Sequence, residues 1–465
     1  MGRRSDKQEE LFIPATQISK GSGHPFYSRL DGFLREAGFD PMVEELCEPH
    51  YKEGGRPGIP PGVYFRMIFI GYFEGISSQR GIAWRCADSL ALRDFLGYAI
   101  TEATPVHTSM TMIRKRLPEE VFRQVFLFTL KTLEEGGFLK GKAFGIDATT
   151  LEANAAMKSI VRRDNGASWK EYLRELAKAE GIENPTDEDL QRLDRARKGK
   201  KASNKEWGSK TDPDSRIAKM KDGRTHLAYK AEHSVQLESG AIVDAHVTHA
   251  DRGDTTTGPE SMARAQRNLS DAGVAVRFAE AVCDKGYHSN DVLAQCEEAG
   301  VRSYIPERKQ KGRRKWTDKP EGSEAAYRNN ATRMARAKGK RLGRQRSERV
   351  ERTFAHVCET GGSRRSWLRG LENASKIHQI KCAAYNLGLY LRLAFGMRKP
   401  RNWDEGTIPG AKFSFAGLIA TAWVLTVSRE PGIVAALATL WLLSAAILAA
   451  HNGANFKGRA GNLVI

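Results

Sequence analysis

Ala143-Phe144-Gly145-Ile146-Asp147 is an apolar run that ends in an aspartate, and the predicted fold extends outward from it. The pattern predicts a β-strand over 143–152. An aspartate at the end of an apolar strand projects from the rim of the sheet, where solvent, substrate and metal can all reach it. A second apolar run, 279–283, repeats the arrangement because Asp284 follows it. The repetition favours one shared site over two unrelated turn caps.

The segments around this run alternate between strand-like and helix-like patterns. The predicted strands are 143–152, 227–237, 241–248, 274–284 and 301–305, and the predicted helices are 255–271, 290–299, 347–360 and 374–395. A turn sequence at 238–240 joins the second and third strands into a hairpin. This order predicts an α/β domain of the ribonuclease H-like type, with a mixed five-stranded sheet flanked by helices.

A third carboxylate, Glu351, is predicted to reach the same site from a helix. Ser347, Glu351 and Phe354 fall at i, i+4 and i+7, so Glu351 is predicted to share an apolar stripe. A carboxylate that is turned toward a core needs a partner, and a metal can supply it. Glu348, beside this stripe, is the alternative third ligand, and its other interpretation is an exposed ion pair at i+4.

Three carboxylates suit a hard divalent cation. Mg²⁺ prefers oxygen ligands and retains several waters, and Mn²⁺ could substitute for it. Two such ions about 3.5–4 Å apart would activate an attacking water or 3′-hydroxyl and stabilise the leaving oxygen. We therefore predict that Asp147, Asp284 and Glu351 are both the catalytic residues and the metal ligands.

The charge of the chain points to a polyanionic partner. Its 465 residues carry a net charge of +18, with a pI of about 9.6. Residues 308–349 hold 16 Lys or Arg against 4 Asp or Glu, which is +12 of that total. This concentration of positive charge in one segment favours contacts with phosphates over a general role in solubility. The six cysteines are scattered without a C-x-x-C pair, so neither a zinc ribbon nor a disulfide framework is supported.

Residues 24–135 are predicted to form a separate helical domain. An apolar run at 63–73 and a second predicted helix at 79–88 are separated by a Gly-Ser break, and a further helix begins at Thr108 or Ser109. Short helices joined by small-residue turns fit a DNA-binding helix-turn-helix unit, and a plain helical bundle fits the composition equally well. The other predicted segments are an N-terminal tail at 1–23, a catalytic domain at 140–398 with charged insertions at 158–222 and 307–345, and an apolar tail at 399–465.

Several short motifs resemble those of the DDE-type transposases of bacterial insertion sequences, in the group with Asp-x-Gly-Tyr and Val-Glu-Arg-Thr-Phe motifs. They occur in order at 56–61, 72–78, 144–149, 211–216, 250–255, 283–287 and 348–354. The resemblance extends over about residues 24–398. Lys285 stands where this family commonly has glycine, which leaves the Asp-x-Gly-Tyr pattern intact.

The resemblance implies a ribonuclease H-like catalytic domain behind a helical DNA-binding domain. It implies Mg²⁺-dependent cutting and strand joining at the terminal inverted repeats of a mobile element, with Asp147, Asp284 and Glu351 as the catalytic acids. Double-stranded DNA is the implied partner, and the pairing of two element ends implies a homodimer or higher oligomer. The expected location is the bacterial cytoplasm, at the nucleoid. The alternative function is an inactive, domesticated or decayed copy that only binds DNA, and a third is an ordinary nuclease.

The basic and amide side chains divide by chemistry. The residues predicted from their charge to contact backbone phosphates are Lys309, Lys311, Arg313, Arg314 and Lys315. The resemblance adds Arg344, Arg346 and Arg364 or Arg365 as phosphate contacts, because some members of the family carry basic residues shortly before and after the third acid. The residues predicted to read base edges are Gln79, Arg80, Arg114 and Arg116. Trp316 is expected either to stack on an exposed base or to be buried.

The C-terminal tail contains two apolar runs, 413–427 and 432–450. The second has no charged residue and is long enough to be a membrane-span candidate. A buried or dimer-forming helical hairpin is the competing interpretation. Membrane insertion is the less favoured of the two, because an enzyme that acts on DNA has no clear use for a bilayer.

Overall fold

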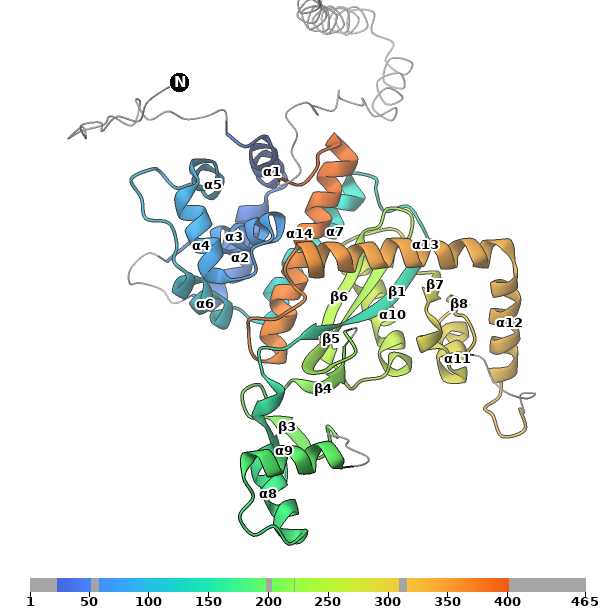
Figure 1. Cartoon of the computed structure of the whole chain (residues 1–465). Coiled ribbons are helices and arrows are strands. Elements are labelled where there is room, and N and C mark those ends of the chain that lie inside the picture. The colour runs from blue at the N-terminus through green and yellow to red at the C-terminus, as the bar shows by residue number, and fades with distance from the viewer. Residues whose placement is uncertain (1–22, 52–57, 198–202, 221, 309–315, 401–465) are drawn as a thin grey trace, which may run out of the picture. The chain divides into compact units, whose positions relative to one another are not determined.

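The computed structural model describes residues 23–51, 58–197, 203–220, 222–308 and 316–400 (Figure 1). Five predicted phosphate contacts lie outside the described residues, namely Lys309, Lys311, Arg313, Arg314 and Lys315, and so do both apolar runs of the tail. Among the helices within the described ranges, none combines the length and the apolar character that a bilayer span requires.

A mixed sheet forms the centre of the α/β region. Its strands are β1 (Ala143–Glu152), β4 (Arg216–Lys219), β5 (Thr225–Gln236), β6 (Ile242–His249), β7 (Glu280–Cys283) and β8 (Arg302–Tyr304). The order is β4-β5-β1-β7-β8, and β6 pairs with β5 on the edge that β4 also uses. β7 runs parallel to β1 and β8 runs parallel to β7, whereas β5 is antiparallel to β1 and β6. The predicted five strands are present with β4 as an unpredicted sixth, and this mixed α/β arrangement is consistent with a ribonuclease H-like fold.

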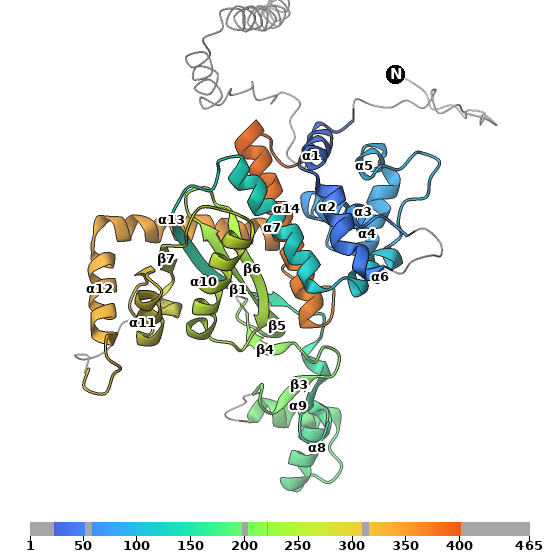
Figure 2. The same ribbon diagram turned by 180° about the vertical axis from the view of Figure 1, so that it is seen from behind.

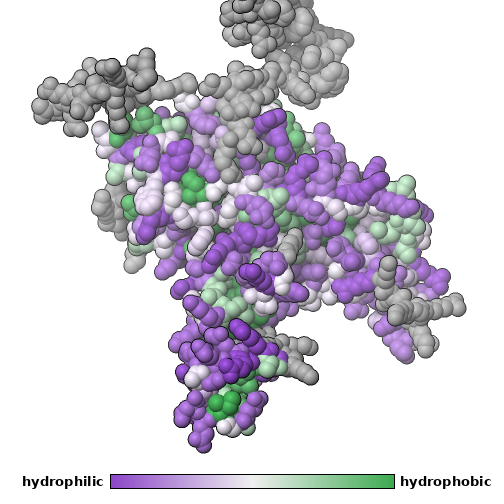
Figure 3. Space-filling model, in the orientation of Figure 1, coloured by the Kyte–Doolittle hydropathy of each residue, from purple (hydrophilic) through white to green (hydrophobic). Residues whose placement is uncertain are grey.

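Helices cover both faces of the sheet. Helices α13 (Ala337–Phe354) and α14 (Leu371–Phe395) lie on one face, where the His233 ring of β5 stacks on Phe354 and contacts His378. Helix α10 (Asp254–Asp271) lies on the other face, where Thr257 bonds to Glu232 of the same strand. Figure 1 shows α13 crossing in front of the strands, and Figure 2 shows α10 on the reverse side. The surface over α13 is largely hydrophilic (Figure 3).

Gly145 allows α13 to approach the central strand closely. A Cβ atom at this position would lie 2.8 Å from Val350 Cγ2, 3.0 Å from Arg346 Cγ and 2.8 Å from Leu237 Cδ2. Real Cβ atoms are not found at the shorter of these distances from neighbouring carbons, so only glycine permits this contact. The glycine of the 144–149 motif therefore sets the height of α13 above β1, directly beside Asp147.

The N-terminal helices are α1 (Pro25–Glu36), α2 (Phe39–Cys47), α3 (Pro61–Glu74), α4 (Gln79–Asp88), α5 (Leu90–Leu96), α6 (His107–Arg116) and α7 (Glu119–Glu135). A short 3₁₀ helix, η1 (Glu48–His50), follows α2. Helix α3 is buried almost all round, and both α3 and α7 pack against α14. One hydrophobic core runs through these helices and the sheet. The predicted boundary at 135–140 is thus not a break in packing, and the helix-turn-helix assignment is not confirmed.

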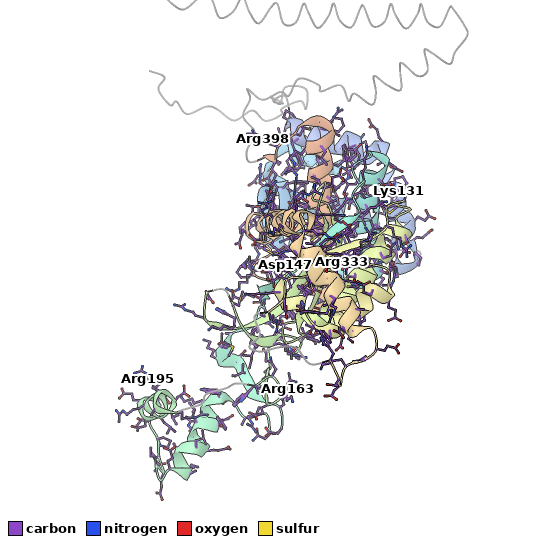
Figure 4. The ribbon with its side chains drawn as sticks, turned by 90° about the vertical axis from the view of Figure 1, so that its right-hand side faces the viewer. Lys131, Asp147, Arg163, Arg195, Arg333 and Arg398 are labelled. Carbon is purple, nitrogen blue, oxygen red and sulfur yellow. The ribbon has the colours of Figure 1, made fainter. Side chains whose placement is uncertain are left out.

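The 158–222 insertion begins within the 3₁₀ helix η2 (Met157–Ser159) and contains β2 (Ile160–Arg162), α8 (Trp169–Ala179), α9 (Asp187–Ala196) and β3 (Trp207–Ser209). Strands β2 and β3 pair with each other, and α8 and α9 share a small core of their own. Thr186 and Asp189 form a capping box at the start of α9. Figure 4 labels two arginines of this insertion, Arg163 and Arg195.

Two predicted boundaries are wrong. The strand predicted over 274–284 is only β7, because its four residues are those that pair with β1. The helix predicted over 347–360 is the end of α13, which begins ten residues earlier and continues as a π-helix, η4 (Ala355–Thr360). The first half of α13 carries Lys and Arg with little apolar periodicity, so its sequence did not predict a helix. The remaining helices, α11 (Asn290–Glu298) and α12 (Ser323–Ala335), pack together after β7 and β8.

Candidate active site

One predicted aspartate lies on β1 and the other directly follows β7, the parallel strand beside it. Ile146 of β1 is paired with Cys283, the last residue of β7, so Asp147 and Asp284 are each the next residue after this pair. Neighbouring strands are about 4.8 Å apart, which places both carboxylates at one end of the strand pair. Figure 4 labels Asp147 where α13 crosses the sheet. The sequence prediction that these two residues share one location is consistent with this register.

Asp147 is held by its own backbone and by an arginine. Its Oδ1 accepts a hydrogen bond of 2.8 Å from the Ala148 N–H, and its Oδ2 accepts one of 2.8 Å from Arg346 Nη1. The Arg346 side chain is 12% exposed and the Asp147 side chain 24%, so solvent screens this ion pair only partly. Arg346 was predicted to contact a DNA phosphate, and the structure instead directs its guanidinium at the carboxylate of Asp147.

Burial is the main influence on the pKa of Asp147. Burial raises the pKa of this carboxyl above its ordinary value, the Arg346 guanidinium and the Ala148 N–H oppose that rise, and the charge of Asp284 adds to it. A carboxylate whose ionised form is disfavoured by burial and by a second carboxylate is stabilised by a nearby cation. In this structure, Arg346 supplies the positive charge.

Asp284 is positioned by a short turn that is braced from beneath the sheet. It caps the 3₁₀ helix η3 (Lys285–Tyr287), where its Oδ1 accepts from the Gly286 N–H at 2.5 Å. Tyr287 is buried and donates a hydrogen bond of 2.6 Å to Glu232 on the far face of β5. Its ring lies against Gly258 of α10, where a Cβ would come within 2.7 Å of the ring. The tyrosine and glycine of the Asp-x-Gly-Tyr motif thus hold the loop that carries Asp284.

Glu351 is exposed, and the prediction that it shares a buried stripe is wrong. The buried positions of this segment are Val350, Thr353, Phe354, Val357 and Cys358, so Phe354 of the predicted stripe is buried whereas Glu351 is not. Glu351 instead lies on the side of α13 that also carries Lys340, Arg344 and Ser347, at i, i+4, i+7 and i+11. Glu348 is 58% exposed and pairs with Arg352 at 2.8 Å, as its other interpretation anticipated.

The three carboxylates do not form a closed cluster. Their oxygens do not all lie within 4.8 Å of one another, and in the described part of the chain only His233, His378 and Cys382 meet that criterion. Ligand atoms that all lie within 4.8 Å of one another could bind a single ion. Mg²⁺–oxygen distances are about 2.0–2.1 Å, and two ions separated by about 3.5–4 Å allow ligands farther apart than this.

A cleft of about 790 Å³ opens beside Asp284 along α13. Arg346 lines this cleft, and its guanidinium lies at Asp147, which is not itself a lining residue. The basic side chains around the cleft are Lys285, Lys340, Arg344 and Arg346. Arg344 is exposed, as a phosphate contact requires. The cleft combines an acidic site with a basic wall, a combination that suits a phosphodiester substrate.

The predicted base-reading residues differ in their exposure. Arg114 is 5% exposed and donates to Asn373 Oδ1, and Gln79 accepts from Thr111 while its Nε2 is buried, so neither can reach a base edge. Arg80 is exposed, and Arg116 is exposed with its guanidinium 4.4 Å from the centre of the Tyr51 ring. Base reading by Arg80 and Arg116 stays a prediction.

Three further candidates make contacts within the protein. Arg364 donates to Thr149 Oγ1 and to the Thr150 carbonyl oxygen, which braces the end of β1. Arg365 lies 5.0 Å from the Trp367 ring. Trp316 is half-buried, and its ring is 5.3 Å from that of Tyr327.

Sequence reasoning missed the structural role of the 211–216 motif. The Asp212 carboxylate is fully buried and accepts from the Tyr229 hydroxyl at 2.6 Å and from the Gly370 N–H at 3.1 Å. Asp214 accepts from the Leu371 N–H at the start of α14. An apolar surrounding cannot be recognised from a short polar motif, so the sequence held no signal for this burial.

Two family models match this chain in order. The model described as "Transposase domain (DUF772)" matches residues 16–116, and the one described as "Transposase DDE domain" matches residues 195–387. The second range includes Asp284 and Glu351, and Asp147 lies between the two ranges. No curated protein matches the chain. The solved structure titled "Mos1 transposase paired-end complex with left transposon end" is similar with 8% identity and a TM-score of 0.17, over 67% of this chain and 82% of that chain.

Both models describe transposase domains, and their matched ranges include the motifs at 72–78, 283–287 and 348–354. The chain therefore belongs to the DDE-type transposases of insertion sequences.

Proposed function

We propose that this transposase cuts DNA at the terminal inverted repeats of its insertion sequence and joins the freed 3′-hydroxyl to target DNA. The proposed catalytic residues and metal ligands are Asp147, Asp284 and Glu351, and the proposed metal is Mg²⁺. The observation that supports the proposal is the register of β1 and β7, in which Asp147 and Asp284 each follow the paired residues Ile146 and Cys283.

The donor set fits a hard divalent cation. All three proposed ligands offer carboxylate oxygens, which Mg²⁺ prefers. Burial and the neighbouring charge of Asp284 raise the pKa of Asp147, so its ionised form is disfavoured. A bound cation would stabilise that ionised form. Bound there, the ions would activate the attacking oxygen and stabilise the leaving one.

The other residues of the site have roles that follow from their positions. The basic residues along the cleft would hold the phosphodiester backbone, with Arg344 and Lys340 on the same side of α13 as Glu351. Arg346 must leave Asp147 before a metal ion can share that oxygen. The Glu232–Tyr287 bond beneath the sheet keeps the Asp284 turn in place while the cleft is occupied.

Two DNA ends must be brought together before strand transfer, so we propose that the active form is a homodimer or higher oligomer on double-stranded DNA. A catalytically inactive DNA-binding protein remains the alternative outcome of the same experiment. The presence of all three acids favours the enzyme.

The test is cleavage of a labelled duplex that ends in the element's own terminal repeat. With Mg²⁺, the wild-type protein should nick this duplex at the element boundary. Asp147→Asn, Asp284→Asn and Glu351→Gln should each lower the rate more than about a hundredfold, because each removes a metal ligand worth several kcal/mol of transition-state stabilisation. Binding to the duplex, measured by gel shift, should remain.

Glu348→Gln is the matched control, since Glu348 lies one turn from Glu351 on the same helix and pairs with Arg352. It should cut at close to the wild-type rate. If Glu348→Gln is inactive and Glu351→Gln cuts normally, the third acid is misassigned. If the wild-type protein binds the duplex and does not cut it with Mg²⁺ or Mn²⁺, the protein is the DNA-binding alternative.

A further inference from the structure

Three side chains with nitrogen and sulfur ligand atoms meet in the core, beside the proposed catalytic site and separate from it. His233 lies on β5, and His378 and Cys382 lie one turn apart on α14. Their exposed fractions are 0%, 2% and 0%. One ligand atom from each lies within 4.8 Å of the others. No acidic oxygen belongs to this group, so its chemistry differs from that of the aspartate pair.

The separations are close to those between ligands of a tetrahedral ion. The Cys382 Sγ is 3.4 Å from His233 Nε2, and His378 Nε2 is 2.8 Å from the same atom. Tetrahedral bonds of about 2.0–2.1 Å to nitrogen and 2.3 Å to sulfur place two nitrogens about 3.3 Å apart and a nitrogen and a sulfur about 3.5 Å apart. The sulfur–nitrogen separation already fits, and the two imidazoles need to separate by about 0.5 Å.

The orientation of His233 is fixed by a residue outside the group. Its Nδ1 is 2.9 Å from Thr353 Oγ1, and the hydroxyl of Thr353 donates to the Val350 carbonyl oxygen at 2.8 Å. Because the hydroxyl proton is used there, Thr353 accepts a hydrogen bond from the Nδ1–H of His233. The lone pair of His233 Nε2 therefore points at His378 and Cys382. Metal-bound histidines are oriented by such a bond on the other ring nitrogen.

The group is poorly satisfied as a purely hydrogen-bonded cluster. A single Nε2 lone pair of His233 is approached by both a second imidazole and a thiol. The Nδ1 of His378 is buried without a hydrogen-bond partner among the described residues. Buried polar groups in native cores usually have partners. The sharing of one His233 Nε2 lone pair, and not the Nδ1 of His378, favours an additional occupant between the three ligand atoms.

We propose that His233, His378 and Cys382 bind a structural Zn²⁺ ion that links β5 to α14. Two imidazoles and a thiolate are ligands that zinc prefers over the oxygen-seeking Mg²⁺. On binding, the Cys382 thiol loses its proton to solvent and its sulfur forms the bond to zinc. Cys358 lies outside this group of close ligand atoms. It is a candidate for the fourth ligand because it is 1% exposed on η4, a segment that packs against α14.

The charge balance also favours two thiolates. Zn²⁺ with two thiolates and two neutral imidazoles is a neutral site, as burial requires. Lys381, beside Cys382, donates a hydrogen bond to the Gly362 carbonyl oxygen. Its positive charge further favours a second, negatively charged thiolate. A small cleft of about 210 Å³ is lined by His378, Lys381 and Gly362, and it provides a route for the ion from solvent.

The role of this zinc would be to fasten the sheet to the helix that contacts α3 and α7. His233 is paired in register with Asp147, so the same link would also steady the central strand at the catalytic aspartate. A Zn²⁺ ion bound only to the folded state stabilises that state in proportion to the logarithm of its concentration over its dissociation constant.

The test is metal content of the purified full-length protein, grown with zinc and washed with a weak chelator. About one zinc per chain is expected by mass spectrometry. Replacement by Co²⁺ should produce visible d–d bands and a thiolate charge-transfer band. The variants His378→Ala and Cys382→Ser should lose the ion. The control variant Cys296→Ser should keep it, because Cys296 is a buried cysteine on α11 that contacts Met262 and is not a proposed ligand.

Thr353→Val provides a second measurement that does not remove a ligand. It should weaken zinc binding about 10–100-fold while the protein stays folded, because only the bond that orients His233 is lost. Less than about a tenth of an equivalent of zinc in the wild-type protein, together with Co²⁺ spectra that lack a thiolate band, would show a hydrogen-bonded core cluster only and overturn the proposal.

Discussion

Arg346→Met is the most informative single change at the candidate site. Methionine keeps the unbranched stem that packs beside Gly145 and removes the guanidinium that bonds to Asp147. In the wild-type protein, a divalent ion that binds Asp147 must first displace this guanidinium. The variant should therefore bind Mg²⁺ or Mn²⁺ more tightly in the absence of DNA.

The size of the effect follows from the ion pair. A hydrogen bond to a charged group contributes about 1.5–3 kcal/mol. Both side chains are less than a quarter exposed, at 12% and 24%, so solvent screening reduces this contribution little. Since a tenfold change in affinity corresponds to about 1.4 kcal/mol, the variant should bind the ion about ten- to a hundredfold more tightly.

Isothermal titration calorimetry of the full chain with Mn²⁺, at a pH where Asp147 is ionised, measures this directly. Arg344→Met is the control, because Arg344 lines the same cleft and is exposed. Loss of that more distant charge should change the affinity less than about threefold. An Arg346→Met variant with unchanged or weaker binding would contradict competition between the guanidinium and the metal.

Four further changes test the fold and the electrostatics. Arg66→Met should cost about 3 kcal/mol in urea unfolding, because Arg66 is 4% exposed and bonds two aspartates, whereas Arg35→Met, with a side chain that is 68% exposed, should cost less than about 1 kcal/mol. Gly145→Ala should destabilise the protein by about 1–3 kcal/mol and slow DNA cleavage, because the new Cβ pushes α13 off β1. Mn²⁺ affinity should fall on acidification at a higher pH than an ordinary aspartate would give, because the pKa of Asp147 is raised. The same shift means that the folded state holds this proton more tightly than the unfolded chain, so Asp147→Asn should not lower the melting temperature.

Segments with a clear apolar or amphipathic pattern that follow a recognisable break could be predicted from the sequence. The predicted strand at 143–152 and the predicted helix at 79–88 match β1 and α4. Both are apolar or amphipathic stretches that follow recognisable breaks. The extent of β7 was not predictable, because its ends are set by pairing with β1 and not by its own residues.

The candidate site was only partly predictable. Asp147 and Asp284 each end an apolar run, and the adjacency of their strands follows from the α/β order. The inward position of Arg346 was missed because an arginine in a basic segment was assumed to face DNA. Arg346 and Val350 are four residues apart and share the buried side of α13, so the helical period would have revealed it once the buried stripe was placed correctly.

Anomalous diffraction from crystals of the protein with its element-end DNA and Mn²⁺ tests the central claim most directly. Two peaks about 3.5–4 Å apart should lie between Asp147 and Asp284, with Glu351 bound to one ion and Arg346 displaced from the carboxylate. Manganese peaks away from both aspartates, or coordinated by Glu348 in place of Glu351, would contradict the assignment.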